Sequence, residues 1–271
     1  LFGSAFADQL TGEAEANGLS GGAGDDRLRG LAGDDLLVGG AGADILEGGT
    51  GSDTASYAGS NAGVTVRLDS GFAAGGHAEG DTFSSIENLI GSDHNDDLRG
   101  GSVANRLEGG LGDDTLNGRG GADALIGGSG SDTATYASSV QGVTARLDGG
   151  ANTGGEAEGD TFSSIENLTG SASHDTLIGS SGANRLNGGS GDDLLLGGSG
   201  GDALNGGAGT DTASYAGSSA GVTAQLDSGL ATGGDAQGDT FDSIENLTGS
   251  GHADSFRGNG AVPGFQFKSE A

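Results

Sequence analysis

Large aliphatic residues recur along this chain at intervals of nine, each inside a short polar stretch rich in glycine. The series Leu28, Leu37 and Leu46 belongs to an unbroken run of the pattern G-G-x-G-x-D-x-U-x, where U is the aliphatic position. One apolar residue among polar neighbours is typical of a short strand with one buried face. The preceding glycines and aspartate indicate a turn. The pattern therefore predicts a long succession of units, each a turn followed by a short strand.

Seventeen stretches fit this pattern to different degrees. Ten clear repeats keep Gly at position 4 and Asp at position 6, and they start at Gly21, Gly30, Gly39, Gly48, Gly109, Gly118, Gly127, Gly188, Gly197 and Gly206. Seven degenerate repeats start at Gly3, Gly12, Gly91, Gly100, Gly170, Gly179 and Gly249. One match would be weak evidence in a glycine-rich chain, but ten in phase indicate a repeat architecture.

A longer period overlies the nonapeptide, because Tyr57, Tyr136 and Tyr215 are equally spaced along the chain. Each long unit holds a block of nonapeptides and then a bridge of related sequence. The expected blocks are 1–56, 91–135 and 170–214, the expected bridges are 57–90, 136–169 and 215–248, and 249–271 holds a degenerate repeat and a C-terminal cap. In each block the last repeat carries Ala at the core position, which indicates a change of cross-section towards the bridge.

Apolar spacing in the first bridge predicts ordered structure. Val64, Val66 and Leu68 alternate with polar residues, as in a half-buried strand. Phe83, Ile86 and Leu89 indicate a second buried edge, and the glycine-rich stretch between is a loop. We interpret the bridges as wider coils of one solenoid; the alternative is three separate rolls on ordered spacers.

Composition limits the kind of fold. Glycine is 62 of 271 residues, and there is no Trp and no Met, so a conventional globular core is not expected. The net charge of −29 makes nucleic acid and anionic membrane poor partners. Acidic, glycine-rich sequence also fits disorder, which we expect of the chain without cations. No apolar run reaches transmembrane length, so membrane insertion is not expected.

Neither disulfides nor a visible signal peptide help to place the chain. It has no cysteine, which fits a metal-folded extracellular protein but also many cytosolic ones. The chain begins at Leu1 without an initiator methionine. We therefore expect it to be processed or cut from a longer protein.

On these repeats the chain resembles the RTX, or hemolysin-type calcium-binding, proteins. The resemblance implies an all-β fold, a right-handed parallel β-roll or β-solenoid in which two nonapeptides make one turn and repeats n and n+2 stack. It also implies multiple Ca²⁺ ions held by position-6 aspartates and by carbonyls at positions 2 and 4. The implied aspartates are Asp26, Asp35, Asp44, Asp53, Asp114, Asp123, Asp132, Asp193, Asp202 and Asp211. The implied carbonyl donors are Gly22, Gly24, Gly33, Gly40, Gly42, Gly49, Gly51, Gly110, Gly112, Gly121, Gly128, Gly130, Gly189, Gly191, Gly198, Gly200, Gly207 and Gly209.

Elementary chemistry favours the same ion. Aspartates stacked at strand spacing, about 4.8 Å, repel one another unless a cation lies between them. Calcium accepts six to eight oxygen ligands in flexible geometry, whereas magnesium demands a tighter octahedron and zinc prefers His or Cys. If stacked pairs bind, a block of six repeats holds at most about four ions and a block of five about three. Aspartate is also common in turns without any metal.

The degenerate repeats predict weaker sites. Asp8, Asp96, Asp175 and Asp254 stay acidic but lack the position-4 glycine, and Asn17, Asn105 and Asn184 replace the acid. The histidines lie away from core positions and are assigned to solvent. Glu87 and Asp81, with their counterparts in the other bridges, hold loops through backbone hydrogen bonds or bind extra calcium; we favour the hydrogen bonds.

No catalytic arrangement is visible, so we do not expect an enzyme. We expect an extracellular or cell-surface structural segment that folds on calcium, such as an adhesin stalk or fibre, with end-to-end self-association and an unknown carbohydrate or cell-surface partner. Export by type I secretion is implied by the resemblance. The alternative is a calcium-dependent module of a secreted protease, lipase or epimerase; a flat sugar- or ice-binding face fits less well, because the bridges interrupt it. The C-terminal AVPGFQFKSEA is a capping strand or a remnant of a secretion signal.

Overall fold

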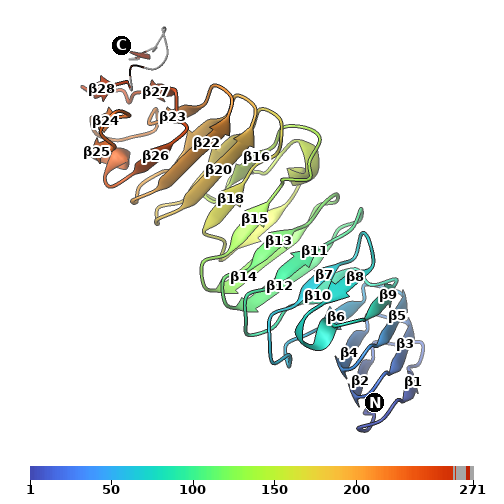
Figure 1. The fold of residues 1–271 in the computed structure, drawn as a ribbon. Helices are drawn as coiled ribbons and strands as arrows, with labels where there is room; N and C mark the ends of the chain where they lie inside the picture. The colour runs from blue at the N-terminus through green and yellow to red at the C-terminus, as the bar shows by residue number, and fades with distance from the viewer. Residues whose placement is uncertain (259, 261–266, 269–271) are drawn as a thin grey trace. The chain divides into compact units, whose positions relative to one another are not determined.

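The computed structural model describes residues 1–258, 260 and 267–268, whose regular secondary structure is almost entirely short β-strands joined by turns (Figure 1). The chain divides into two compact units. The first unit is Leu1–Thr133 with Asp160–Ile165, and the second is Ala134–Gly159 with Glu166–Ala271. The only helical elements described are three short 3₁₀ turns in the bridges, η1 (Gly76–Ala78), η2 (Gly155–Ala157) and η3 (Gly234–Ala236). The described residues contain no helix long and apolar enough to span a lipid bilayer.

The strands of the first unit form three ladders. Their bounds are β1 (Gln9–Thr11), β2 (Gly18–Ala23), β3 (Arg27–Ala32), β4 (Leu36–Ala41), β5 (Ile45–Thr50), β6 (Thr54–Ser56), β7 (Thr65–Arg67), β8 (Phe72–Ala74), β9 (Thr82–Ser84), β10 (Asn88–Ile90), β11 (Asp97–Arg99), β12 (Arg106–Leu111), β13 (Thr115–Asn117), β14 (Ala124–Ser129) and β17 (Thr161–Ser163). The ladders run β1-β3-β5-β9, β2-β4-β6-β10-β12-β14-β17 and β8-β7-β11-β13. β15 (Thr133–Thr135) lies where the two units meet in the sequence.

The second unit repeats this plan. Its strands are β16 (Thr144–Arg146), β18 (Asn167–Thr169), β19 (Thr176–Ile178), β20 (Arg185–Ser190), β21 (Leu194–Leu196), β22 (Ala203–Ala208), β23 (Thr212–Ser214), β24 (Thr223–Gln225), β25 (Leu230–Thr232), β26 (Thr240–Asp242), β27 (Asn246–Thr248), β28 (Ser255–Arg257) and β29 (Phe267–Lys268). The ladders run β18-β20-β22-β26, β16-β19-β21-β23-β27-β29 and β25-β24-β28. Most of the predicted C-terminal cap lies outside the described residues, but β29 pairs with β27.

Strand register confirms that two nonapeptides make one coil. Leu19 pairs with Leu37 and Leu28 with Leu46, so each partner lies two nonapeptides further along the chain. Within each ladder the strands run parallel, apart from the β7–β8 and β24–β25 hairpins among the strand pairs described. This is the parallel β-roll that the resemblance to RTX proteins implied.

The bridges continue the same ladders within each unit. In the first unit Leu46 pairs with Phe83 and Ala55 pairs with Leu89, so these coils use a much longer stretch of chain than two nonapeptides. In the second unit Leu204 pairs with Phe241 across a bridge in the same way. The bridges are therefore wider coils inserted into a roll, as their apolar spacing indicated.

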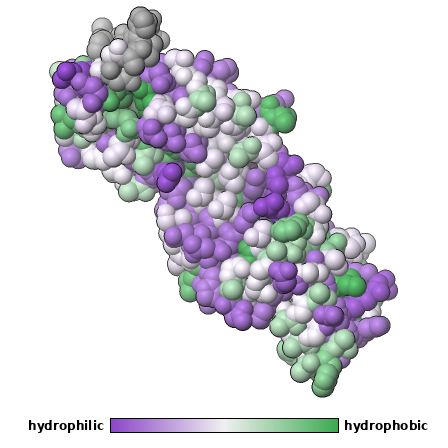
Figure 2. Space-filling model, in the orientation of Figure 1, coloured by the Kyte–Doolittle hydropathy of each residue, from purple (hydrophilic) through white to green (hydrophobic). Residues whose placement is uncertain are grey.

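The core consists of columns of aliphatic side chains, one on the inward face of each ladder of strands. Leu28, Leu37 and Leu46 have no exposed surface, because strand residues alternate between the interior and solvent. At the end of each block the core position shrinks to alanine, and the following tyrosine fills the space: Tyr57 is 2% exposed. Figure 2 shows polar and apolar residues mixed over the visible face. The outward strand positions of the chain include half-exposed Leu36 and Ile45.

Candidate metal sites

The seventeen repeats fall into two backbone classes. In every clear repeat the residues at positions 2 and 4 have positive φ, as in Gly22 at 111° and Gly24 at 106°. Leu31 (85°) and Arg119 (69°) adopt this conformation at position 2 although they are not glycine. In the degenerate repeats neither position has positive φ. The second and fourth peptide units of the clear repeats are thus turned differently from those of the degenerate ones.

One oxygen of each position-6 side chain in the clear repeats joins a ladder along the stack. The Oδ1 atom of Asp44 accepts the N–H of Asp26 at 2.8 Å, and Oδ1 of Asp26 accepts the N–H of Asp8 at 2.7 Å. The same bond links Asp96 to Asp114 and Asp193 to Asp211. This ladder fixes each carboxylate on its own turn and aligns it with the carboxylate of the next coil.

The second oxygen behaves differently in the two classes. In eight clear repeats the Oδ2 atom is buried and has no hydrogen-bond partner in the described structure; these are Asp26, Asp35, Asp44, Asp53, Asp114, Asp193, Asp202 and Asp211. Each Oδ2 lies so close to the position-1 glycine that a Cβ there would collide with it, as at Gly21 and Asp26. A buried carboxylate oxygen without a partner is costly, at about 1–3 kcal/mol or more for a charged group.

The degenerate repeats satisfy this second acceptor from their own backbone. The position-2 N–H donates to the side chain of residue 6, from Ser92 to Oδ2 of Asp96 and from Ser171 to Oδ2 of Asp175, each at 2.6 Å. The asparagine repeats do the same, with Gly101 N–H donating to Oδ1 of Asn105. The remaining donor–acceptor pairs are Ser4–Asp8, Glu13–Asn17, Ser180–Asn184 and Ser250–Asp254. These turns need no cation to complete their hydrogen bonding.

Clear repeats stack directly on clear repeats at four places. The pairs are those starting at Gly21 and Gly39, Gly30 and Gly48, Gly109 and Gly127, and Gly188 and Gly206. In each pair the carbonyl oxygens at positions 2 and 4 of one turn face the glycines of the next, as Gly22 faces Gly40 and Gly24 faces Gly42. Carboxylate and carbonyl oxygens therefore gather at the same stacked turns.

Side chains alone do not make a metal cluster here. No group of three or more His, Cys, Asp or Glu side chains close enough to hold an ion occurs among the residues that the structure describes. Any ion at these turns must take most of its ligands from backbone carbonyls. Calcium accepts carbonyl ligands readily, and it does so in loops that turn sharply at glycine.

Burial makes the stacked carboxylates hard to ionise. Desolvation, together with the neighbouring Asp96 and Asp132 charges, raises the pKa of Asp114 to about 7. Desolvation likewise raises the pKa of Asp193 and of Asp202 to about 6. The same cause raises the pKa of Asp44. A cation placed against these groups would favour their charged form, which is the reverse of what burial does.

Acids of the bridges extend the ladder. Oδ1 of Asp81 accepts the N–H of Asp44 at 2.8 Å, and Oε2 of Glu87 accepts the N–H of Asp53 at 2.9 Å. Unlike the eight aspartates whose Oδ2 has no hydrogen-bond partner, Asp81 also has a donor for its second oxygen, the hydroxyl of buried Tyr57 at 2.9 Å. The backbone hydrogen bonds that we favoured for these acids are therefore present.

Comparison with known proteins agrees with the geometry. The family model described as the RTX calcium-binding nonapeptide repeat matches residues 1–28, 20–55, 99–134, 160–195 and 178–213, which together cover more than half of the chain. The chain belongs to this RTX family. Its nonapeptides are therefore calcium-binding repeats, of a structural kind typical of secreted proteins. No curated protein matches the chain.

The donor set of the RTX turns fits calcium. Ten position-6 aspartates lie on their turns as the repeat pattern placed them, and they are buried. The carbonyls at positions 2 and 4 are turned by positive φ in the same repeats. Bound calcium would supply the opposite charge that the buried Oδ2 atoms lack, and all the donors here are oxygen, which a hard cation prefers.

Sequence reasoning missed two kinds of residue. The first kind is Leu31 and Arg119, which stand at position 2 of clear repeats and have positive φ like the glycines there. A backbone carbonyl does not depend on the side chain of its residue, so only the position within the nonapeptide could have identified these two. The second kind is the position-2 donor of the degenerate repeats, which is serine in five of the seven repeats.

Most of the histidines lie in solvent. His94, His174 and His252 are exposed, as expected, and Nδ1 of His174 accepts the N–H of Asp192 at 2.6 Å. The expectation that all the histidines face solvent was wrong for His77, which is half-buried in the bridge, where its backbone N–H donates to Oγ of Ser60.

Proposed function

We propose that this chain is a non-catalytic, extracellular segment that folds on calcium and serves as a rigid part of a larger secreted or surface protein, such as an adhesin stalk or fibre. The observation that carries the proposal is the set of buried Oδ2 atoms in the clear repeats that have no hydrogen-bond partner. Calcium ligation removes that penalty, so binding free energy becomes folding free energy.

The proposed ligands are the ten position-6 aspartates of the clear repeats with the carbonyls at positions 2 and 4. The four pairs in which clear repeats stack on each other are the strongest sites, because both turns contribute carbonyl and carboxylate oxygens. Asp8, Asp96, Asp175 and Asp254 are poor ligands, since their own backbone already occupies the second oxygen. Blocks 1–56, 91–135 and 170–214 are then the calcium-dependent parts, and the bridges and the segment 249–271 depend on calcium less.

A folding switch of this kind suits export. Calcium is scarce inside cells and abundant outside, so the chain stays unfolded until it leaves the cell and then gains RT ln(1 + [Ca]/Kd) for each site. The proposed route of export is type I secretion, which the family resemblance supports. Among the described strands, β1 lies at the edge of its ladder, which supports end-to-end association of rolls.

Circular dichroism against free calcium, with magnesium as the control ion, tests the switch. We expect little β signal in chelator, a cooperative gain near millimolar calcium and no gain with magnesium at the same concentration. A spectrum that chelator leaves unchanged, or one that magnesium restores equally well, contradicts the proposal. Light scattering in the same titration measures the association of rolls.

A further inference from the structure

Each bridge carries an aspartate two residues after its first strand, and the three aspartates differ in their arginine partners. In the first unit Oδ2 of Asp69 lies 3.4 Å from Nε of Arg99 and 3.3 Å from Nε of Arg119. In the third bridge Oδ2 of Asp227 lies 2.8 Å from Nε of Arg257. An arginine from a neighbouring coil thus binds the aspartate in both places.

The middle bridge lacks this arginine. One long period further along the chain, Ile178 occupies the place of Arg99 and Gly198 occupies the place of Arg119. Asp148 instead pairs with Arg146 of its own chain segment, with distances of 3.0 Å from Nε to Oδ1 and 2.6 Å from Nη2 to Oδ2. These two side chains remain 35% and 38% exposed, so the pair lies at the surface.

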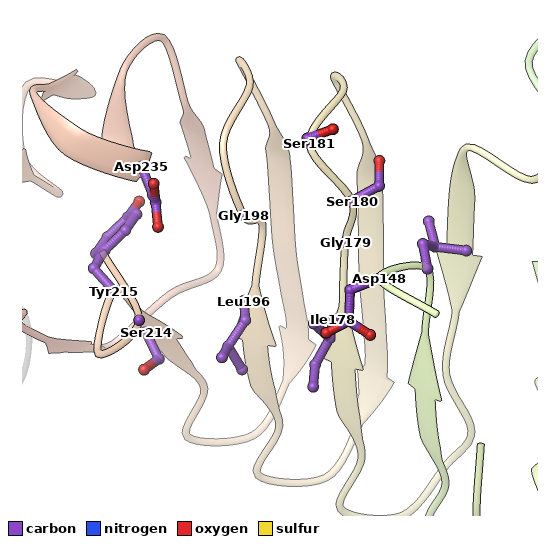
Figure 3. A pocket seen from close by; sticks show the side chains of 12 residues that line it. Asp148, Ile178, Gly179, Ser180, Ser181, Leu196, Gly198, Ser214, Tyr215 and Asp235 are labelled. Carbon is purple, nitrogen blue, oxygen red and sulfur yellow. The ribbon is translucent and has the colours of Figure 1, made fainter. Parts of the chain in front are cut away.

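A groove of about 420 Å³ opens in the second unit where the arginines are missing. Figure 3 shows Ile178 and Leu196 in a row, with Asp148 at one end and Asp235 beside Tyr215 at the other. The row follows the stack, because Ile178 pairs with Leu196 on the next coil. The volume of the groove falls in the usual range for ligand sites, about 300–1,000 Å³.

The walls of the groove combine a short apolar floor with acids at both ends. Asp148 has one arginine partner, and the Asp235 carboxylate has no hydrogen bond or ion pair within the described residues. Ser180 and Ser181 add hydroxyls on the turns above the floor. The groove therefore offers carboxylate acceptors at a distance from each other, with aliphatic surface between them.

We propose that this groove binds the guanidinium group of an arginine side chain on a partner polypeptide. A guanidinium presents five donors in a planar fork that matches carboxylates, and its alkyl stem covers apolar surface such as Ile178 and Leu196. The first unit supplies the internal precedent, since Asp69 lies within reach of two guanidinium groups at once. Asp148 can share its carboxylate with Arg146 and an incoming arginine in the same way.

Binding of blocked tripeptides to the full calcium-loaded chain, followed by NMR at about 150 mM salt, tests the proposal. The probes are Gly-Arg-Gly, Gly-Lys-Gly and Gly-citrulline-Gly, the last having the shape of arginine without its charge. We expect saturable shifts for the arginine peptide at residues 147–148, 178–181, 196–198 and 235, with weaker binding of the lysine peptide and none of the citrulline peptide.

Variants locate the effect. Ile178→Arg places an arginine where Arg99 stands in the first unit, so it should fill the groove and weaken peptide binding about tenfold or more. Asp235→Asn should weaken binding several-fold without filling the groove, while Asp242→Asn, an exposed acid elsewhere in the second unit, makes the same change of net charge and should have no effect. Circular dichroism with calcium confirms that each variant folds, so a failure here is separate from failure of the calcium switch.

Either of two kinds of result overturns the proposal: binding that does not depend on the groove, or binding that depends on net charge alone. One is binding that Ile178→Arg and Asp235→Asn leave intact. The other is binding that Asp242→Asn lowers as much as Asp235→Asn does, or that arginine and lysine peptides share with shifts spread over the surface, because the net charge of −29 then attracts cations without a site.

Discussion

Replacing Asp44 by asparagine separates a calcium ligand from a residue that merely forms a turn. Asp44 is fully buried, its Oδ1 accepts the N–H of Asp26, and its Oδ2 has no hydrogen-bond partner in the described structure. Asparagine keeps the Oδ1 acceptor and removes the charge. The variant therefore keeps the ladder but loses the ion that the carboxylate attracts.

The expected change has two parts of opposite sign. At low calcium the variant should be more stable than the parent chain by about 1–3 kcal/mol, because a buried charged acceptor without a partner is gone. As free calcium rises, the parent gains about 1.4 kcal/mol for every tenfold increase and every ion bound, and the variant gains that much less for each ion it has lost. The two lines of unfolding free energy against log free calcium should cross.

Urea unfolding at a series of free calcium concentrations measures these lines. Asp96→Asn is the matched control, because Asp96 already accepts the N–H groups of Val64 and Ser92, and its line should keep the slope of the parent chain. Parallel lines for Asp44→Asn and the parent, with the variant less stable at every calcium concentration, would refute the reasoning. Asp44 would then be a turn former and nothing more.

Three further changes test the two turn classes and the bridge. Gly40→Ala should destabilise the calcium-loaded roll by more than about 2 kcal/mol, since its φ is 105° and the new Cβ would meet the Gly22 carbonyl. Gly101 lies at the same position of a degenerate repeat, with open space around it and no positive φ. The free energy of unfolding of Gly101→Ala, measured by thermal denaturation, should therefore stay within about 1 kcal/mol of that of the parent chain. Tyr57→Phe leaves Oδ2 of Asp81 without its donor and should cost about 1–3 kcal/mol in urea unfolding with saturating calcium. In calcium-depleted buffer, circular dichroism should show more order at pH 4.5 than at pH 7.5. Burial raises the pKa of Asp114 to about 7, so the contribution of this group to stability is full below the ordinary pKa of an aspartate and is lost as pH rises through 7. An equal or larger signal at pH 7.5 would contradict this.

The repeat period carried most of the fold. A nine-residue spacing of leucines predicted the strand positions and the buried column, since a strand with one apolar residue can bury only that face, whereas the coil of two nonapeptides was implied by the RTX resemblance. The alternation at Val64 and Val66 placed strand β7, and both side chains are buried. What the spacing could not give was the antiparallel hairpin β7–β8, because Phe72 and its neighbours are partly exposed and carry no period.

The position of the aspartates was predictable and their state was not. The motif placed Asp26 and Asp96 at the same point of their turns, and both are buried on the ladder. Only the structure separates them, because the decisive contact is the orientation of one N–H, that of residue 2, which no side-chain pattern records. The serine at that place is a partial signal, since serine often bonds to nearby backbone in turns.

Glycine permits the calcium-type turn but does not produce it. Gly182 stands at position 4 and Gly101 at position 2 of degenerate repeats, yet neither has positive φ. Both repeats have asparagine at position 6, and its amide completes both of its hydrogen bonds internally: Oδ1 of Asn105 accepts the Gly101 N–H, and Nδ2 donates to the Glu87 carbonyl. A side chain that can satisfy itself therefore selects the other turn even where glycine would allow the first. The degenerate repeats are then self-sufficient coils stacked against the clear ones within each unit, and under the proposed function the peptide orientation at position 2 distinguishes the coils that need calcium from those that do not.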